Sequence, residues 1–288
     1  MHRAYTAAFA AICLSASPAL AQRDFSAVEI KVTEVTDGIY MLEGSGGNIG
    51  LSVGEDGAFV IDDQFAPLSD KIMAAIKTVT DKPVEFVLNT HHHGDHTGGN
   101  EAFGETGAYI VAHDNVRGRL AAAEDTPDAA LPVITFSESA TFHRNDQEIH
   151  IFHPDNAHTD GDAIVYFRDA NVVHMGDVFF SRRYPFIDVS SGGDIDGFIS
   201  ALEATAAMVD DDVKIIPGHG PLSTKADIEA TAAMLNEVRA RVQALIDQGL
   251  DEDAAAAADP LADLNEEWGW RFIDGERMTR AAYQTLAE

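Results

Sequence analysis

Four residues of one short segment have the types and the spacing of a metal-binding motif. His91, His93, Asp95 and His96 form the pattern H-x-H-x-D-H directly after the apolar segment 84–88. Imidazole nitrogens and carboxylate oxygens are ligands that divalent zinc prefers, and a loop after a rigid strand lets side chains two residues apart converge on one ion. A solvated polar loop is the alternative interpretation, but this density of histidine and aspartate favours a metal site.

Three later segments carry further histidines and aspartates next to glycines. They are Ala157-His158-Thr159-Asp160-Gly161-Asp162, Met175-Gly176-Asp177 and Pro217-Gly218-His219-Gly220. Together with the first motif, and in this order, they resemble the four metal motifs of the metallo-β-lactamase superfamily over about residues 30–250. Four ordered motifs are a far more specific signal than any one of them alone.

The resemblance implies a pair of metal ions and a fold that positions them. The first zinc ion would be held by His91, His93 and His158, the second by Asp95, His96 and His219, and the Asp177 carboxylate would bridge the two. The implied fold is α/β, a four-layered αβ/βα sandwich with the metals at one edge. True β-lactamases that bear a cysteine ligand have a thiolate where this chain has Asp177. Because oxygen makes the second position harder, we expect manganese or iron to be acceptable there as well as zinc.

Two zinc ions would allow hydrolysis without a serine or cysteine nucleophile. A water between them has its pKa lowered to about 7 and so supplies a hydroxide that attacks a carbonyl carbon, while a metal polarises the carbonyl oxygen. The ions, two carboxylates and a hydroxide leave about one positive charge, which attracts an anionic substrate. We expect Asp95 to orient the water and pass a proton to the leaving group; a ligand role alone is the alternative.

Two residues before the first motif are candidates for supporting it. Asp62 ends a predicted strand and resembles the superfamily's buried aspartate beneath the metal loop, so it would hold a ligand histidine by a hydrogen bond. An ordinary turn residue is the alternative. Asn48 ends the glycine-rich segment Gly44–Asn48, which we expect to form a flexible flap over the pocket, with a plain hairpin turn as the other interpretation.

Residues near the third motif and in the last part of the chain are candidates for contacts with substrate or for packing. Arg182, Arg183 and Tyr184 follow the segment of Asp177, where superfamily enzymes often grip a substrate carboxylate, and arginine suits this because its guanidinium is a planar fork. Surface solvation is the alternative for each. The aromatic residues of the C-terminal part, Trp270 and Phe272 among them, are expected to pack rather than to contact a ligand.

The elements that must position these motifs follow from hydrophobic periodicity and turn signals. Four short β-like segments at 30–35, 39–42, 49–53 and 58–61 predict an antiparallel meander. Helical spacing follows at 68–79, and the later segments alternate. Strands are expected at 84–88, 108–112, 149–152, 163–167, 172–174 and 213–216, and helices from 114, at 195–208 and at 225–248. This order predicts two packed sheets with helices outside.

The two ends of the chain are expected to serve other purposes. Residues 1–21 contain Arg3, an apolar stretch and a terminal Ala19-Leu20-Ala21, which is the pattern of a secretory signal peptide cleaved after Ala21. The mature chain, residues 22–288, would be a single periplasmic or secreted metallo-hydrolase domain with a helical extension at 251–288. The one cysteine, Cys13, lies in the signal peptide, so no thiolate is expected among the metal ligands.

Composition limits the partners. The chain has 48 Asp and Glu against 19 Lys and Arg, a formal charge of −29, which excludes an extended grip on nucleic acid. Beyond the first residues no apolar run reaches the roughly 20 residues of a membrane span, so we expect no membrane anchor. A small-molecule substrate is the expected partner, and the sequence does not indicate an oligomeric state.

The sequence therefore predicts a secreted dinuclear zinc hydrolase that opens a cyclic amide or ester, a β-lactam or a lactone. A thioesterase similar to glyoxalase II or a small-molecule phosphodiesterase on the same metals is the first alternative. A one-iron enzyme such as a persulfide dioxygenase is the second, and a periplasmic metal-binding protein without hydrolysis is the third.

Overall fold

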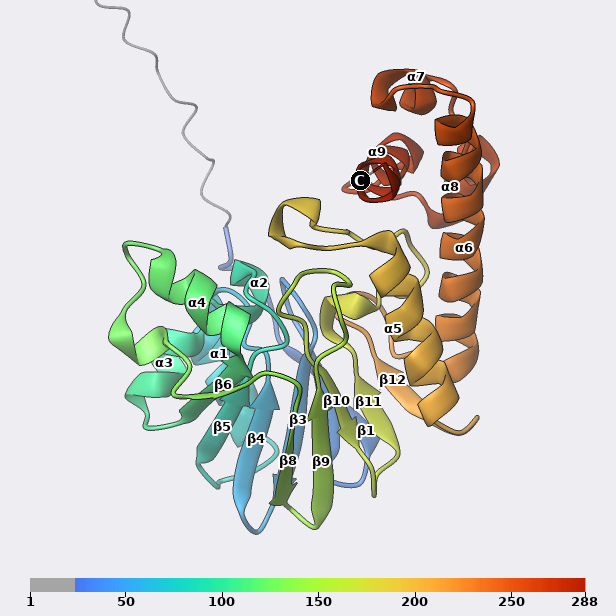
Figure 1. Ribbon diagram of the computed structural model, residues 1–288. Coiled ribbons are helices and arrows are strands. Elements are labelled where there is room, and N and C mark those ends of the chain that lie inside the picture. Colours follow the sequence, from blue (N-terminus) through green and yellow to red (C-terminus); the bar gives the residue numbers. More distant parts are fainter. Residues whose placement is uncertain (1–23, 288) are drawn as a thin grey trace, which may run out of the picture.

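The computed structural model describes residues 24–287, which form two β-sheets packed face to face with helices on the outer sides (Figure 1). One sheet has the strand order β1-β2-β3-β4-β5-β6-β7 and the other β12-β11-β10-β9-β8. The α/β sandwich expected from the motifs is thus confirmed. The signal peptide at 1–21, its cleavage site and Cys13 lie outside the described residues. Among the helices that the structure does describe, none is long and apolar enough to cross a membrane.

The first sheet is antiparallel at one side and parallel at the other. Strands β1 (Lys31–Thr36), β2 (Ile39–Glu43), β3 (Ile49–Gly54) and β4 (Gly57–Ile61) form the expected meander, and β5 (Val84–Leu88), β6 (Tyr109–His113) and β7 (Ile134–Phe136) continue it in parallel. Parallel neighbours need crossovers. These contain α1 (Ser69–Lys77), α2 (Gly94–Thr97), α3 (Asn100–Glu105) and α4 (Asp114–Ala122), with the short turns η1 (Ala66–Leu68) and η2 (Asp128–Ala130). The carboxyl ends of β4, β5 and β6 therefore lie at one edge.

The second sheet is antiparallel except for its last pair. It consists of β8 (Ser139–Arg144), β9 (Gln147–Phe152), β10 (Ile164–Phe167), β11 (Val172–His174) and β12 (Lys214–Ile216), the last two parallel. The crossover between β11 and β12 contains η3 (Gly176–Val178), η4 (Val189–Ser191) and α5 (Ile195–Met208), and α6 (Lys225–Asp247) follows β12. The periodicity predicted no strand at the positions of β7 and β8.

Apolar side chains hold the layers together. Between the sheets, fully buried residues of the first, such as Ile61 and Val111, pack in one cluster with Val165 and Phe167 of the second. Separate clusters lie under α1 on the outer face of the first sheet and under α5 and α6 on the outer face of the second. Burial of this apolar area is the main force that fixes the strand ends and so the loops that carry the motifs.

The C-terminal part is helical, as expected. It contains α7 (Glu252–Ala257), α8 (Ala262–Trp268) and α9 (Gly275–Leu286), and α9 packs against α5 and α6 (Figure 1). Buried Met278 of α9 belongs to the same apolar cluster as Leu235 of α6. The extension therefore shares a core with the second sheet instead of standing apart from it.

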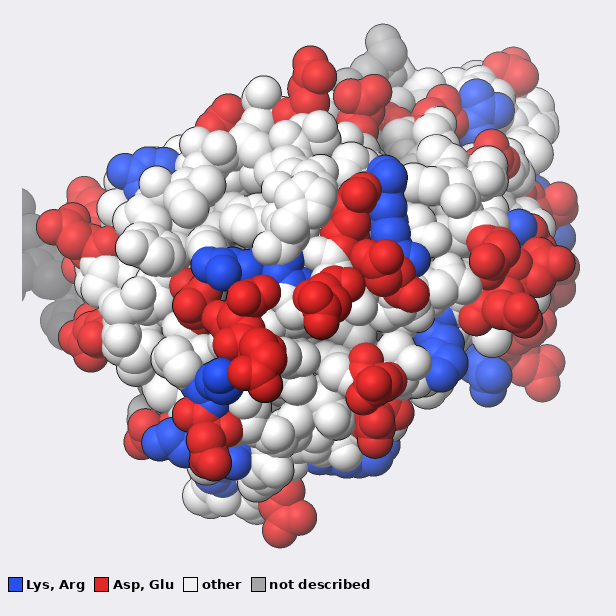
Figure 2. All heavy atoms as spheres, turned by 90° about the horizontal axis from the view of Figure 1, so that it is seen from below, with Lys and Arg blue, Asp and Glu red and all other residues white. Residues whose placement is uncertain are grey.

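The surface reflects the excess of acidic residues. Figure 2 shows the face seen from below in Figure 1, where acidic side chains gather in clusters and basic side chains are scattered between them. Among the described residues on this face, the basic groups thus form no continuous surface of the kind that tracks a phosphate backbone.

Candidate metal centre

The first motif lies at the edge where the parallel strands end. After β5, the backbone N–H of Thr90 donates to Asp62 Oδ1 (2.7 Å) and its hydroxyl donates to Asp62 Oδ2 (2.8 Å). Asp62 itself follows β4, so two neighbouring strand ends are held together by one carboxylate. The loop between β5 and α2 is fixed in this way, and the histidine side chains leave it in defined directions.

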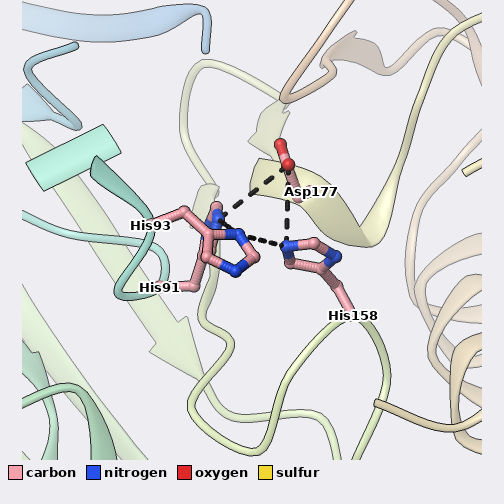
Figure 3. A group of neighbouring side chains, drawn as sticks. All are labelled: His91, His93, His158 and Asp177. Carbon is pink, nitrogen blue, oxygen red and sulfur yellow. Dashed lines mark hydrogen bonds and ion pairs between the residues drawn. The ribbon is translucent and has the colours of Figure 1, made fainter. Parts of the chain in front are cut away.

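Three histidines and one aspartate form a first cluster of donor atoms (Figure 3). His93 Nδ1 lies 3.1 Å from His91 Nε2 and 3.0 Å from His158 Nε2. Asp177 Oδ2 lies 3.9 Å from His91 Nε2 and 3.7 Å from His158 Nε2. Ligand atoms about 2.1 Å from a tetrahedral ion are about 3.4 Å apart, so these spacings match donors around one zinc ion.

Asp95, His96 and His219 form a second cluster beside the first. Their donor atoms are close to one another, because Asp95 Oδ2 lies 3.8 Å from His96 Nε2 and 3.5 Å from His219 Nε2. Asp177 reaches this cluster with its other oxygen, Oδ1, which is 3.2 Å from His96 Nε2 and 3.4 Å from His219 Nε2. The two oxygens of Asp177 thus face different clusters, which is the arrangement of a bridging carboxylate.

Two buried atoms test whether cations fit these clusters. His96 Nε2 and Asp177 Oδ1 are both buried and lack a hydrogen-bond partner. Such an unpaired polar group costs about 1–3 kcal/mol unless something else satisfies it. A divalent cation between them would satisfy both atoms, so the donor set fits a metal pair.

The pKa values of the cluster are also those of metal ligands. Burial lowers the pKa of His158 to about 4, and burial together with His96 and His158 keeps the pKa of His91 well below its usual range. Both rings are therefore neutral, the form that binds metal. Burial disfavours the charge of Asp177, but His219 and His96 lower its pKa well below the usual range, so this carboxyl is ionised.

Comparison with known proteins agrees with this geometry. A family model described as the metallo-beta-lactamase superfamily matches residues 42–219, which is more than half of the chain. The chain belongs to the metallo-β-lactamase superfamily. Within it, the chain is a hydrolase with a metal-binding cluster of histidine and aspartate.

Two relatives that match part of this chain in sequence share one name. Hydroxyacylglutathione hydrolase from Polaromonas sp. (strain JS666) is 29% identical over 195 residues, covering 67% of this chain and 68% of that protein. The protein of the same name from Pelagibacter ubique (strain HTCC1062) is 32% identical over 109 residues, covering 37% of this chain and 41% of that protein.

Solved structures of superfamily members share the fold at lower identity. A metallo-beta-lactamase from Pontibacter korlensis superposes with a TM-score of 0.64 and 20% identity, covering 72% of this chain and 99% of that chain. The DIM-1 metallo-beta-lactamase superposes with a TM-score of 0.63 and 16% identity, covering 73% of this chain and 98% of that chain. At such identities the likeness establishes the fold alone.

Four of the cluster histidines are oriented by a hydrogen-bond partner on the side of the ring that faces away from the cluster. On each ring, the nitrogen that faces away from the cluster has a partner within hydrogen-bond distance, which orients the ring. The pairs are His91 Nδ1 with Thr90 Oγ1 (3.1 Å), His93 Nε2 with Asp188 Oδ2 (3.0 Å), His96 Nδ1 with Asp62 Oδ2 (2.7 Å) and His158 Nδ1 with the carbonyl oxygen of Phe186 (2.7 Å). The hydrogen bond expected of Asp62 is present. Asp188 was missed, because no local spacing connects it with a histidine 95 residues earlier.

Asn48 supports the last superfamily motif instead of covering the pocket. Its buried side-chain amide donates to the carbonyl oxygens of Pro217 (2.9 Å) and Gly220 (2.8 Å), on both sides of His219. The backbone N–H of Gly47 donates to the carbonyl oxygen of Asp95 (3.1 Å). These bonds tie the β2–β3 connection to both metal-binding loops, and the expected flexibility of the flap stays a prediction. The alternative, a hairpin connection, is confirmed.

The three candidates after Asp177 have different surroundings. Tyr184 is completely buried in the core, and its hydroxyl has no hydrogen-bond partner, so the structure places it away from any substrate. Arg182 is exposed, and its Nε lies 4.0 Å from Asp227 Oδ1. Arg183 lies over the ring of Trp270, 5.0 Å from its centroid, and among the described residues no carboxylate pairs with it. Arg183 therefore stays a candidate for binding a substrate anion.

Proposed function

We propose that the protein is an exported dinuclear zinc hydrolase that cleaves an acyl compound at its carbonyl carbon. The observation that carries the proposal is the position of Asp177, whose Oδ2 faces the first histidine cluster and whose Oδ1 faces the second. One carboxylate between two complete donor sets is what a metal pair requires. Manganese or iron in the second position would keep the same chemistry, because its ligands include oxygen.

The chain supplies orientation and proton transfer around that pair. Zinc ions held there would lower the pKa of a bound water to about 7 and polarise a carbonyl oxygen. The side chains of His96 and Asp177 are buried, whereas those of Asp95 and His219 are 26% and 21% exposed. His93 is 24% exposed as well, so the centre is open to solvent along His93, His219 and Asp95. The carboxylate of Asp95 is placed to accept a proton from the attacking water and to return it to the leaving group.

Thioesters are the first substrate class that we propose. The two curated relatives are named hydroxyacylglutathione hydrolase, which is a thioesterase activity, and their names support the same bond type here. Lactones and β-lactams are the second class, supported by the expected export and by the anion-attracting charge of the metal pair. All of these substrates present an activated carbonyl, and the same residues would act on each.

The test is a hydrolysis panel on the mature chain loaded with zinc. It contains acyl thioesters, simple esters, lactones, a chromogenic lactam and a phosphodiester, and the metals are counted in the same sample. We expect about two metals per chain and turnover of at least one carbonyl substrate. Asp177→Asn should lower kcat/KM by more than about a hundredfold. Replacing a residue that only hydrogen-bonds to a metal ligand already lowers metal affinity or activity about 10 to 100-fold, and Asp177 would be a ligand itself. Asp227→Asn, an acid outside the clusters, is the control.

Each other result selects a different function. Two bound metals without turnover of any carbonyl substrate would overturn the proposal and favour a metal-binding protein. One iron per chain with consumption of oxygen would favour a dioxygenase, and turnover of the phosphodiester alone would favour a phosphodiesterase. Export is tested separately by fractionation and N-terminal sequencing, which should begin at Gln22.

A further inference from the structure

A groove lies between the segment Pro185–Ser190 and helix α9, next to the first histidine cluster. It has a volume of about 380 Å³, and Phe186, Ile187, Phe272 and Met278 contribute to its apolar lining. Small-molecule pockets range from about 300 to 1,000 Å³, so this space suits one substituent of a substrate. We call it the α9 groove.

The α9 groove adjoins the proposed metal position through two of its lining residues. The ring of Phe186 stacks on His93 with a centroid distance of 5.9 Å and meets the edge of His158 at 5.5 Å. Asp188, which also lines the groove, lies 3.0 Å from His93 Nε2. None of the cluster side chains lines the groove itself, so a substrate bound at the first cluster would reach it past Phe186 and Asp188.

Aromatic rings connect the groove with the second cluster as well. Phe180 stacks on His219 with centroids 5.1 Å apart, and Trp270 lies 6.3 Å from Phe180. Phe272 continues the series, 5.5 Å from Trp270, and meets Phe186 at 5.3 Å. Phe272 is nevertheless 46% exposed. An exposed ring in such a wall favours an apolar ligand group, because contact with that group removes it from water.

The lining of the groove includes the carboxylate of Asp188, which pairs with His93, and the guanidinium of Arg277, which has no acidic partner among the described residues. Arg277 donates to the carbonyl oxygen of Phe272 and lies over that ring, but among the described residues no carboxylate is within ion-pair distance of it. Arg280, one turn further along α9, pairs with Glu252 and also with Asp253 and Glu276. Other described arginines, such as Arg183, also lack a carboxylate partner, but Arg277 is the one of them that lines the groove, where its guanidinium complements an anionic ligand.

We propose that the α9 groove binds the apolar acyl chain of the substrate, and that Arg277 binds an anionic group carried by that chain. This inference rests on the proposed function, since it assigns the substrate class for the same metal centre. The preferred substrates would be acyl esters or thioesters with an apolar chain that ends in a carboxylate. The C-terminal extension would then determine specificity through Phe272, Ala281 and Arg277.

Three p-nitrophenyl esters separate the two parts of the subsite: the acetate, the octanoate and the monoester of suberic acid. Ala281→Trp should fill the groove and lower kcat/KM about tenfold or more for the two long esters, with the acetate within about twofold. Phe272→Ala, at a half-exposed position that tolerates truncation, should act in the same direction. Arg277→Gln should lower kcat/KM about tenfold for the suberate ester alone. Arg239→Gln on α6 removes the same charge outside the groove and is the control.

A second measurement separates failure of the subsite from failure of the hydrolase. Octanoate and suberate binding to the zinc-loaded protein is measured by calorimetry. If the wild type turns over no carbonyl substrate of the whole panel, lactones and lactam included, but Ala281→Trp and Phe272→Ala weaken octanoate binding about tenfold, the groove is a ligand site and the proposed function is overturned. If the wild type hydrolyses all three esters and the groove variants change them equally or not at all, the subsite is overturned and the hydrolase remains.

Discussion

Asp62 Oδ2 lies 2.7 Å from His96 Nδ1, and both side chains are completely buried. The contact fixes the proton of the imidazole on Nδ1 and leaves Nε2 to face Asp177 and Asp95. Because Asp62 follows β4 and also accepts two hydrogen bonds from Thr90 after β5, one carboxylate sets both the path of the loop and the orientation of the ring.

Replacing Asp62 by asparagine should therefore weaken metal binding at the second cluster. An amide cannot accept all three hydrogen bonds, so the ring of His96 loses its fixed orientation. We expect zinc affinity at that position to fall about 10 to 100-fold, measured by competition with a chromophoric chelator.

Asp63→Asn is a matched control for this variant. Asp63 accepts a hydrogen bond from the backbone N–H of Gly99 through Oδ1, which an amide oxygen also accepts, and burial already disfavours its charge by raising its pKa. Equal loss of zinc affinity in the two variants would contradict the role given to Asp62.

Gly47 is required because the ring of His96 occupies the space of a side chain. A Cβ atom at position 47 would lie 2.1 Å from His96 Cε1, whereas one at Gly94, in the metal loop itself, would meet nothing within 4 Å. Gly47→Ala should therefore remove about one bound metal per chain, while Gly94→Ala should keep full metal content and near wild-type stability. Metal analysis and thermal unfolding of both variants check this, and retention of two metals in Gly47→Ala would refute it.

Asp188 should orient the ring of His93 by a hydrogen bond, as Asp62 orients the ring of His96. The His93 hydrogen bonds, together with those from serines 190 and 191, hold the pKa of Asp188 well below the usual range despite burial, so it stays an ionised partner. Asp188→Asn should lower zinc affinity at the first cluster about 10 to 100-fold and leave the second cluster near its wild-type affinity. Cobalt spectra of the two positions distinguish these results, with the exposed Asp155→Asn as control. A uniform loss at both positions would mean that Asp188 supports the fold in general.

Local sequence predicted the parts of the centre whose residues are close in the chain. The pattern from His91 to His96 and its place after an apolar strand are local, and so are the helices α5 and α6, whose boundaries the periodicity predicted closely. Strands β7 and β8 were missed, because β8 alternates partly exposed residues at the edge of its sheet and β7 has only three residues.

Contacts between distant segments could not be predicted in this way. The role of Asn48 depends on hydrogen bonds to residues about 170 positions later, and no property of Gly44–Asn48 indicates them. Tyr184 follows two arginines and was expected beside them in the pocket, but the chain turns its ring into the core. Trp270 packs on Phe180 as expected, whereas Phe272 is 46% exposed and meets Phe186. Phe180 and Phe186 in turn stack on His219 and His93, a link to the metal centre that only the tertiary structure reveals.

The two clusters should differ in how their metal affinity depends on pH. Burial disfavours a charge on His96, but Asp177, Asp62 and Asp95 outweigh it and raise the pKa of this ring well above its ordinary value of 6.5. The metal-free chain therefore carries a proton on His96 at pH 7. The pKa of His158 in the first cluster is about 4, so that ring is already neutral.

Zinc binding at the second cluster should then release the proton of His96 at pH 7, whereas His91 and His158 in the first cluster have no proton to release. Release of that one proton should make affinity at the second position rise about tenfold per pH unit until the pH passes the pKa of His96, whereas His91 and His158 add no such dependence at the first. In the metal-free protein, folding stability depends on pH in the opposite direction and falls as the pH rises. The stability contributed by charged His96 is complete below 6.5, the pKa of the unfolded chain, and is lost as the pH rises through the higher folded pKa. Calorimetry in two buffers of different ionisation enthalpy measures the protons, and equal release at both positions would contradict the assignment of His96 to a separate, carboxylate-rich cluster.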